Sequence, residues 1–194
     1  LADYTKAIGL DESLVAAYSS RARIYEEQDE FELAVADHTS IIEIDPANAG
    51  AYNNRGSVYQ AWNDFNSAIK DYTQAITLDP NLASAYSNRG RAFQILGDYT
   101  SALIDLNKAI ELEPKNFEAL QYRGKTYEKL GKKDLASKDL AAAAALGYAP
   151  GKLYLEIKDW YRGEQESKSG ISKTNLQALI SNIEKGQLLL RQGK

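Results

Sequence analysis

The sequence predicts an all-α fold, an α-solenoid of stacked helix-turn-helix units, and three observations point to it. The stretch 49–82 returns in 83–116 with the same residue types in the same places, a period of 34 residues. A fixed period in this range is typical of stacked-repeat proteins. Within each stretch the apolar residues recur three and four positions apart, the spacing of one helical face. Large aromatic residues alternate with glycine and alanine, which lets two helices approach closely.

The stretch 49–82 shows how one unit is built. Tyr52 and Gly56 lie on one face of a first helix, and the apolar pattern breaks just before Asp64. Aspartate is a favoured N-cap, so we expect Asp64 to begin the second helix. Pro80 closes the unit, since proline cannot continue a helix and disfavours helix at the residue before it. Each unit is therefore predicted to be a helical hairpin that must stack on its neighbours to bury its aromatic residues.

The same unit can be followed along most of the chain. The sequence begins inside a second helix and without methionine, which we interpret as a truncated or processed chain. The predicted organisation is a second helix of a truncated repeat at 1–14, complete repeats at 15–48, 49–82, 83–116 and 117–148, and C-terminal capping helices at 149–194.

The C-terminal region departs from the repeat pattern after Pro150. A capping-box sequence at Thr174 predicts a helix that continues to about Arg191. This helix either covers the exposed end of the stack, as repeat arrays require, or docks as a helix in a groove.

These features resemble the tetratricopeptide repeat (TPR) family. The stretch 49–82 carries the family's order of aromatic, glycine, aromatic, alanine, aromatic, alanine and proline at the family's spacing. The resemblance covers residues 1 to about 148. It implies a right-handed superhelix of helix pairs, with a concave groove that binds peptides or partner proteins. The residues that match the family's pattern in this stretch are Tyr52, Gly56, Tyr59, Ala68, Tyr72, Ala75 and Pro80.

The resemblance also implies which residues line the groove, because the family uses the faces of each first helix that do not take part in stacking. Many of these side chains are amides and hydroxyls, which suit an extended peptide backbone, although a merely solvated face is the alternative. Carried over to this sequence, the groove residues are Ser19, Arg23, Glu26, Glu27, Asn53, Ser57, Gln60, Ala61, Ser87, Arg91, Gln94, Ile95, Gln121, Lys125, Glu128 and Lys129, with Asn54 and Asn88 at the rim.

One class of ligand is disfavoured by these positions. Family members that bind heat-shock chaperones hold a C-terminal carboxylate with a Lys/Asn, Asn, Lys/Arg clamp spread over three repeats. Asn54 or Asn88 could supply the middle asparagine, but the flanking positions do not fit. They hold Ser19 and Arg23 with Ser84 and Asn88, or Asn53 and Ser57 with Glu118 and Tyr122.

Charged residues recur once per repeat in two columns. An arginine column could form an anion-binding surface, but each arginine adjoins the small residue at the helix crossing, where a charge needs a partner. We therefore predict structural Arg–Asp pairs, within or between repeats. His38 replaces an aromatic residue and is predicted to pack in its place. The columns are Arg21, Arg55, Arg89 and Arg123, and Asp3, Asp37, Asp71, Asp105 and Asp139.

The composition disfavours several classes of function. The chain has no cysteine and one histidine, which excludes thiolate chemistry and leaves no catalytic or metal-binding cluster. We expect no enzyme activity, no metal and no cofactor. The net charge of −4 argues against general nucleic-acid binding, and no apolar run is long enough for a membrane helix. The compartment is unknown, with the cytoplasm as the default, because the interpretation of a truncated or processed chain leaves any targeting signal outside this sequence.

Charge is graded along the chain. Residues 1–48 carry 3 basic and 11 acidic residues, whereas residues 117–194 carry 14 basic and 9 acidic ones.

The first function hypothesis is a non-enzymatic scaffold that binds a peptide or helix of a partner protein in the groove. The alternatives are a module that self-assembles into a homo-oligomer, which opposite charges at the two ends would favour, or a regulatory domain of a larger protein.

Overall fold

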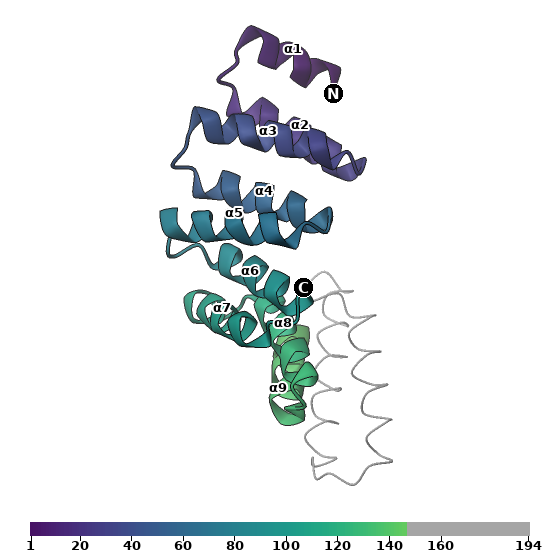
Figure 1. The fold of residues 1–194 in the computed structure, drawn as a ribbon, viewed down its shortest axis with the longest axis vertical. Helices are drawn as coiled ribbons and strands as arrows, with labels where there is room; N and C mark the ends of the chain where they lie inside the picture. Colours follow the sequence, from purple (N-terminus) through teal and green to yellow (C-terminus); the bar gives the residue numbers. More distant parts are fainter. Residues whose placement is uncertain (147–194) are drawn as a thin grey trace, which may run out of the picture. The chain divides into compact units, whose positions relative to one another are not determined.

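The computed structural model describes residues 1–146, which form nine α-helices and contain no strand (Figure 1). They belong to two compact units, an N-terminal unit (Leu1–Glu113) and a C-terminal unit (Pro114–Lys194). The predicted all-α solenoid is confirmed, while the predicted capping helices at 149–194 lie outside the described residues. The helices are α1 (Ala2–Leu10), α2 (Val15–Glu27), α3 (Phe31–Ile44), α4 (Ala49–Ala61), α5 (Phe65–Leu78), α6 (Ala83–Ile95), α7 (Tyr99–Leu112), α8 (Phe117–Lys129) and α9 (Lys133–Ala145).

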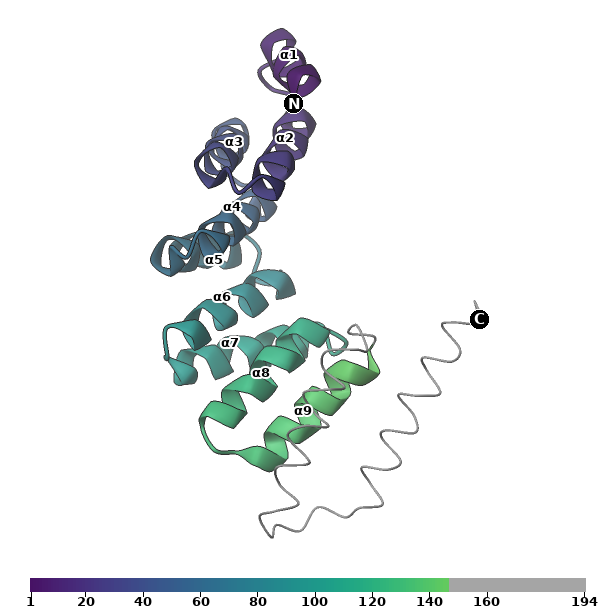
Figure 2. The ribbon, with the colours of Figure 1, turned by 90° about the vertical axis from the view of Figure 1, so that its right-hand side faces the viewer.

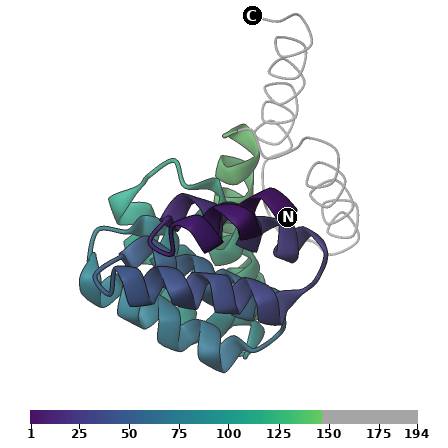
Figure 3. The ribbon, with the colours of Figure 1, turned by 90° about the horizontal axis from the view of Figure 1, so that it is seen from above.

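The N-terminal unit is a stack of three helical hairpins, α2–α3, α4–α5 and α6–α7, with α1 at one end (Figures 1 and 3). The apolar core runs from one hairpin to the next. Ile8 of α1 packs in one cluster with Tyr18 and Ile41 of the first hairpin and with Ala51 of α4. Tyr72 of α5 packs in another cluster with residues of α6. Burial between hairpins is therefore what holds the stack together, as expected for a repeat array.

The turn inside each hairpin requires a left-handed backbone residue. Four residues at intervals of 34 have positive φ angles, and all are of the types that tolerate this conformation. The next residue then begins the second helix, and the Asp64 side chain accepts a hydrogen bond from the Ser67 backbone N–H at 3.1 Å. The predicted cap is thus confirmed. The four left-handed residues are Asp29 (58°), Asn63 (64°), Gly97 (83°) and Gly131 (70°).

Two such caps carry aspartates whose charge is favoured by their position. Hydrogen bonds from the Ser67 side chain and backbone lower the pKa of Asp64, and those from Ser101 lower the pKa of Asp98 in the same way. A carboxylate also interacts favourably with the positive end of the helix dipole. The capping contacts therefore favour the ionised form of both aspartates.

The two helices of a hairpin touch at a glycine. A Cβ atom at Gly56 would lie 2.8 Å from Tyr72 Cε1 and 3.2 Å from the Ala68 carbonyl oxygen, so no larger residue fits without movement. A Cβ atom at Gly90 would likewise lie 2.8 Å from Leu106 Cγ. The first hairpin has alanine at this place and carries the smaller His38 opposite it, buried with 3% exposure. His38 is therefore a packed replacement for an aromatic residue, as predicted.

The C-terminal unit repeats this arrangement in α8 and α9. A Cβ atom at Gly124 would lie 2.8 Å from Leu140 Cγ, and Asn116 caps α8 through a hydrogen bond from the Ala119 N–H at 2.9 Å. Residues 147 and 148, the last of the predicted repeat 117–148, lie outside the part of the chain that the structure describes.

Candidate functional site

Each hairpin holds an arginine of its first helix against an aspartate of its second. Arg55 Nε donates to Asp71 Oδ2 at 2.8 Å and Nη2 donates to Oδ1 at 2.9 Å, so the pair is bidentate. Such planar pairs are among the stronger charge-assisted hydrogen bonds. The predicted Arg–Asp pairing is confirmed, and it lies within hairpins rather than between them. The other pairs are Arg21–Asp37, Arg89–Asp105 and Arg123–Asp139, all 16 residues apart.

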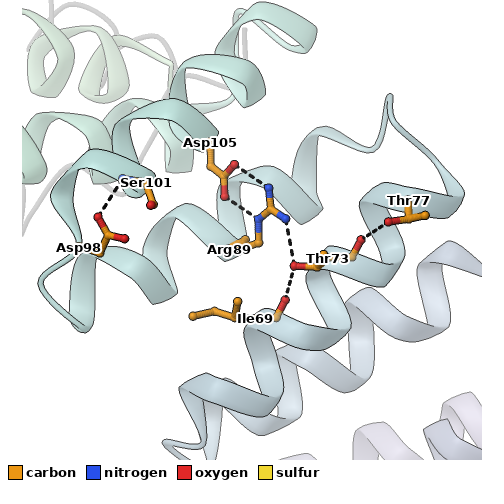
Figure 4. A network of polar contacts seen from close by, with 7 residues as sticks. All are labelled: Ile69, Thr73, Thr77, Arg89, Asp98, Ser101 and Asp105. Atoms are coloured by element: carbon orange, nitrogen blue, oxygen red, sulfur yellow. Dashed lines mark hydrogen bonds and ion pairs between the residues drawn. The ribbon is translucent and has the colours of Figure 1, made fainter.

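A threonine ties each of these pairs in the N-terminal unit to the preceding helix of the stack. Arg89 Nη1 donates to Thr73 Oγ1 at 3.0 Å, and Thr73 in turn donates to the Ile69 carbonyl at 2.7 Å (Figure 4). Arg55 makes the same contact with Thr39 at 3.0 Å. The arginine thus joins three helices, which fixes the register of one hairpin on the next.

The positive charge of each arginine is engaged in contacts within the stack. Hydrogen bonding to Asp71 raises the pKa of Arg55 above its ordinary value, although partial burial opposes this shift. The guanidinium also lies 5.6 Å from the centre of the Tyr52 ring, within cation–π range. Because each arginine of this column is engaged by its own aspartate, the column is a structural feature rather than an anion-binding surface.

The predicted site residues of the N-terminal unit all belong to α2, α4 and α6, which follow one another down the stack (Figure 2). We refer to them together as the first-helix face. They are Ser19, Arg23, Glu26 and Glu27 of α2, Asn53, Asn54, Ser57, Gln60 and Ala61 of α4, and Ser87, Asn88, Arg91, Gln94 and Ile95 of α6.

The structure brings four residues of this face together across α4 and α6. Asn88 Nδ2 donates to Asn53 Oδ1 at 3.1 Å. The Gln60 amide, oriented to satisfy both neighbours, donates to the Asn88 backbone carbonyl and accepts from Arg91 Nη1, each at 3.3 Å. These side chains therefore position one another before any partner arrives.

The face is not uniformly exposed. Ser87 is 1% exposed and Gln60 is 8% exposed, whereas Asn54 lies open to solvent. Within the described residues, the Ser87 hydroxyl has no hydrogen-bond partner. Ser57 is half-buried and accepts a hydrogen bond from the Tyr72 hydroxyl at 3.4 Å. The polar surface on α4 and α6 is consequently narrow and is centred on the two asparagines and Arg91.

The α2 part of the face carries charges of both signs. Arg23 Nη1 lies 3.8 Å from Glu27 Oε1, and both side chains are well exposed. Glu26 Oε1 lies 3.4 Å from Nε2 of the buried His38. Ser19 is exposed, and its hydroxyl donates to the Val15 carbonyl of its own helix at 3.0 Å. Glu26 therefore adds a second link between α2 and α3, beside the Arg21–Asp37 pair. Because α2 contains no asparagine, the Asn53–Asn88 contact has no counterpart on it.

Four predicted site residues lie on α8 in the C-terminal unit and form a separate set. Gln121 is buried, Lys125 is half-buried, and Glu128 and Lys129 are exposed.

The described part of the chain contains neither a cluster of metal-binding side chains nor a helix that could span a membrane. Among residues 1–146, no three histidine, aspartate or glutamate side chains gather as metal ligands would. None of the helices in this range combines the length and the apolar character needed to cross a lipid bilayer.

Comparison with known families identifies the repeat. The family model described as "Tetratricopeptide repeat" matches residues 49–82, and a second model described as "TPR repeat" matches residues 90–131. None of the curated proteins is significantly similar to this chain in sequence.

Solved structures agree with these matches. The first TPR of Spaghetti (RPAP3), solved with the HSP90 peptide SRMEEVD, is 30% identical, with a TM-score of 0.57, and the match covers 60% of this chain and 93% of that one. The first TPR domain of human RPAP3 is also 30% identical, with a TM-score of 0.58 and coverages of 62% and 95%. A crystal structure of MamA shares the fold at 24% identity, with a TM-score of 0.64 and coverages of 82% and 87%.

Proposed function

This chain belongs to the tetratricopeptide repeat family, and we propose that it is a non-enzymatic scaffold whose first-helix face binds an extended segment of a partner protein. The protein-interaction role is common to such repeats. The finer statement, that the partner lies across α4 and α6, rests on the polar contacts of those two helices.

The observation that carries this proposal is the asparagine pair. Once Asn88 has donated to Asn53, Asn53 keeps its amide nitrogen as a donor and Asn88 keeps its side-chain oxygen as an acceptor. A peptide unit offers the complementary carbonyl and N–H groups. Because the pair is already linked across two helices, little side-chain entropy would be lost on binding, which favours affinity.

Catalysis is not favoured by the same residues. The chain's one histidine, His38, is buried, and its Nε2 atom lies 3.4 Å from a carboxylate oxygen of Glu26 rather than beside a hydroxyl group. The aspartates of the repeating column are paired with arginine, and Asp64 at the start of α5 is a helix cap. These groups have structural roles that explain their presence without a reaction.

The ligand is not proposed to be a chaperone tail, although the Spaghetti structure was solved with such a peptide. A C-terminal carboxylate needs flanking cations around the central asparagine. The positions before and after Asn54 hold Ser19 and Arg23, then Ser84 and Asn88, so the third repeat supplies no cation there. An internal segment of a partner fits these residues better than a free C-terminus does.

The proposal can be tested by recovering partners from the source cell extract with two matched variants of the full chain. One carries Asn53→Ala, Asn88→Ala and Arg91→Ala on the first-helix face. The other carries Asn66→Ala, Lys70→Ala and Gln74→Ala, three exposed residues of α5.

We expect the first variant to lose at least about fivefold in partner recovery, since truncation of central polar contacts commonly costs more than 1 kcal/mol, and the second to match the unmodified chain. Both should unfold at similar temperatures. Equal recovery by the two variants would place the binding surface elsewhere on the molecule.

A second candidate function is assembly of the chain with itself, which the charge gradient favours. The acidic residues 1–48 and the basic residues 117–194 could attract one another between molecules in a head-to-tail contact. Sedimentation over a range of concentrations tests this candidate, and the association should weaken as salt is added. A strictly monomeric chain at low salt would remove it.

A further inference from the structure

The turns inside the hairpins of the N-terminal unit lie along one edge of the stack, on the side away from the connections between hairpins (Figure 1). The first of these turns, with the residues that flank it (26–32), holds five acidic side chains and no basic one. Phe31, the first residue of α3, stacks on Trp62 of the next turn, with ring centroids 6.5 Å apart and an interplanar angle of 26°. The aromatic pair therefore joins the acidic turn to the following hairpin.

Trp62 is a large apolar side chain that remains open to solvent. It is 42% exposed although it stacks on Phe31. Tryptophan is among the residue types that most often dominate the binding energy of protein interfaces. The exposed carboxylates of Asp29 and Glu30 immediately precede Phe31, and Asp64 follows Trp62 by two residues. We refer to this surface as the Trp62 patch, which consists of Asp29, Glu30, Phe31, Trp62 and Asp64.

The equivalent turn of the C-terminal unit, between α8 and α9, carries the opposite charge. The residue before the second helix is acidic in every hairpin of the N-terminal unit, whereas it is Lys132 in the C-terminal unit. Two apolar side chains accompany the lysine, since Leu130 is 41% exposed and Leu135 is 45% exposed. We refer to this surface as the lysine turn, which consists of Lys129, Leu130, Lys132 and Leu135.

The stability of the hairpin does not explain a lysine at this place. Asp64 accepts a hydrogen bond from a backbone N–H of α5, whereas Lys132 makes no such bond at the start of α9. A lysine side chain has no acceptor, and its charge lies at the positive end of the helix dipole. A carboxylate from outside the hairpin would offset this unfavourable interaction. The lysine turn is therefore complementary to an acidic partner surface.

We propose that the lysine turn of one molecule docks on the Trp62 patch of a second copy, with Leu130 against the Trp62 ring and Lys132 facing Glu30. The inference rests on the second candidate function, self-assembly, and names the two surfaces that make the contact. Both surfaces expose apolar side chains, and their charges are of opposite sign, so they are complementary in both respects. Each molecule carries both surfaces, so it can bind one copy through each of them.

The next turn along the same edge matches the lysine turn less well. It exposes Ile95 (48%) and Leu96 (51%), but residues 95–100 contain a single charged side chain, Asp98. The Trp62 patch adjoins a turn with five acidic side chains. Charge therefore favours the Trp62 patch over this second apolar site. Leu96 occupies the same place in its repeat as Trp62, which makes it a matched control.

The inference can be tested by sedimentation of the full chain at low salt with two charge reversals, Glu30→Lys in the Trp62 patch and Lys132→Asp in the lysine turn. Each variant alone places like charges in the contact. A mixture of the two restores opposite charges in every contact between unlike molecules.

Three matched controls accompany these variants. Glu43→Lys on α3 and Lys70→Glu on α5 make equivalent charge changes at exposed positions outside both surfaces. Trp62→Ser tests the apolar contact, and Leu96→Ser is its control at the equivalent place of the next hairpin. Thermal unfolding of each variant checks that the fold is retained.

We expect Glu30→Lys and Lys132→Asp each to weaken self-association about tenfold, and their equimolar mixture to recover the affinity of the unmodified chain within about threefold. Trp62→Ser should also weaken it at least about tenfold, whereas the three controls should stay within about twofold. Lys132→Asp should unfold at a temperature no lower than the unmodified chain does, because aspartate is a favoured N-cap. Loss of association in this variant would then not result from loss of the fold.

The other outcomes separate this inference from the function on which it rests. Association that persists in both charge reversals, or a mixture that fails to recover it, would overturn docking of the lysine turn on the Trp62 patch and leave self-assembly intact. Equal weakening by the charge controls would overturn it too, because net charge would then decide association. A strictly monomeric unmodified chain would remove both self-assembly and this inference, and would leave the partner-binding scaffold unaffected.

Discussion

Replacing Asp71 with alanine is expected to lower the free energy of unfolding by about 3–5 kcal/mol, the cost of breaking a buried ion pair from one side. The side chains of Arg55 and Asp71 are only 18% and 9% exposed. The substitution would leave the Arg55 guanidinium without its carboxylate in a place where water cannot fully replace it. Chemical or thermal denaturation of the full chain, followed by circular dichroism at the helix signal, measures the change.

Two comparisons identify the source of this loss. Arg23→Ala removes an exposed pair on a neighbouring first helix and should cost less than about 1 kcal/mol. The double substitution Arg55→Met with Asp71→Leu removes both charges and should recover much of the stability lost in Asp71→Ala. If the Asp71→Ala variant unfolded at the same temperature as the unmodified chain, the Arg–Asp pairs would not stabilise the stack.

Gly56→Ala is expected to destabilise the chain by about 1–3 kcal/mol, although alanine is the better helix former by about 1 kcal/mol. The added methyl group would lie 2.8 Å from the Tyr72 ring, which is fully buried and cannot turn aside. The nearby Ala68 carbonyl at 3.2 Å limits movement on the other side. The free energy of unfolding in urea measures the balance between these opposing effects.

The first hairpin shows how the clash can be relieved. It has Ala22 opposite His38, so a smaller ring accommodates the alanine methyl group there. Tyr72→His should therefore recover part of the stability lost in Gly56→Ala, which a double-mutant cycle would reveal as coupling. Gly9→Ala is the matched control, because a Cβ atom at Gly9 meets nothing within 4 Å. A gain in stability from Gly56→Ala equal to that from Gly9→Ala would contradict this explanation.

The sequence was sufficient for the stacked helical hairpins of residues 1–146, for the Asp64 cap and for the Arg–Asp pairs. The reason is that a strict period places each feature several times, so a column of arginines can be matched with a column of aspartates. The contact of Arg55 with Thr39 was not predicted. Thr5, Thr39 and Thr73 also recur at intervals of 34, which was the available signal, but a polar residue on a helix surface usually has no such role.

The candidate site was less predictable than the fold. Equivalent positions of the repeat were treated alike, yet Ser19 is exposed and Ser87 is buried. A place in the repeat fixes the helix face on which a side chain lies. The solvent exposure of that side chain depends on the packing around it, which a single sequence does not reveal. The same applies to Gln60, whose role in joining α4 to α6 requires Asn88 and Arg91 to lie within hydrogen-bonding distance.

Site-specific crosslinking tests most directly whether the first-helix face is the binding surface. The chain contains no cysteine, so a photoreactive group can be attached at one introduced thiol. Asn54→Cys places it on α4, and Gln74→Cys places it on α5, where the side chain is also exposed. We predict that a recovered partner forms a covalent adduct with the α4 label and not with the α5 label. Adducts from α5 alone would contradict the account.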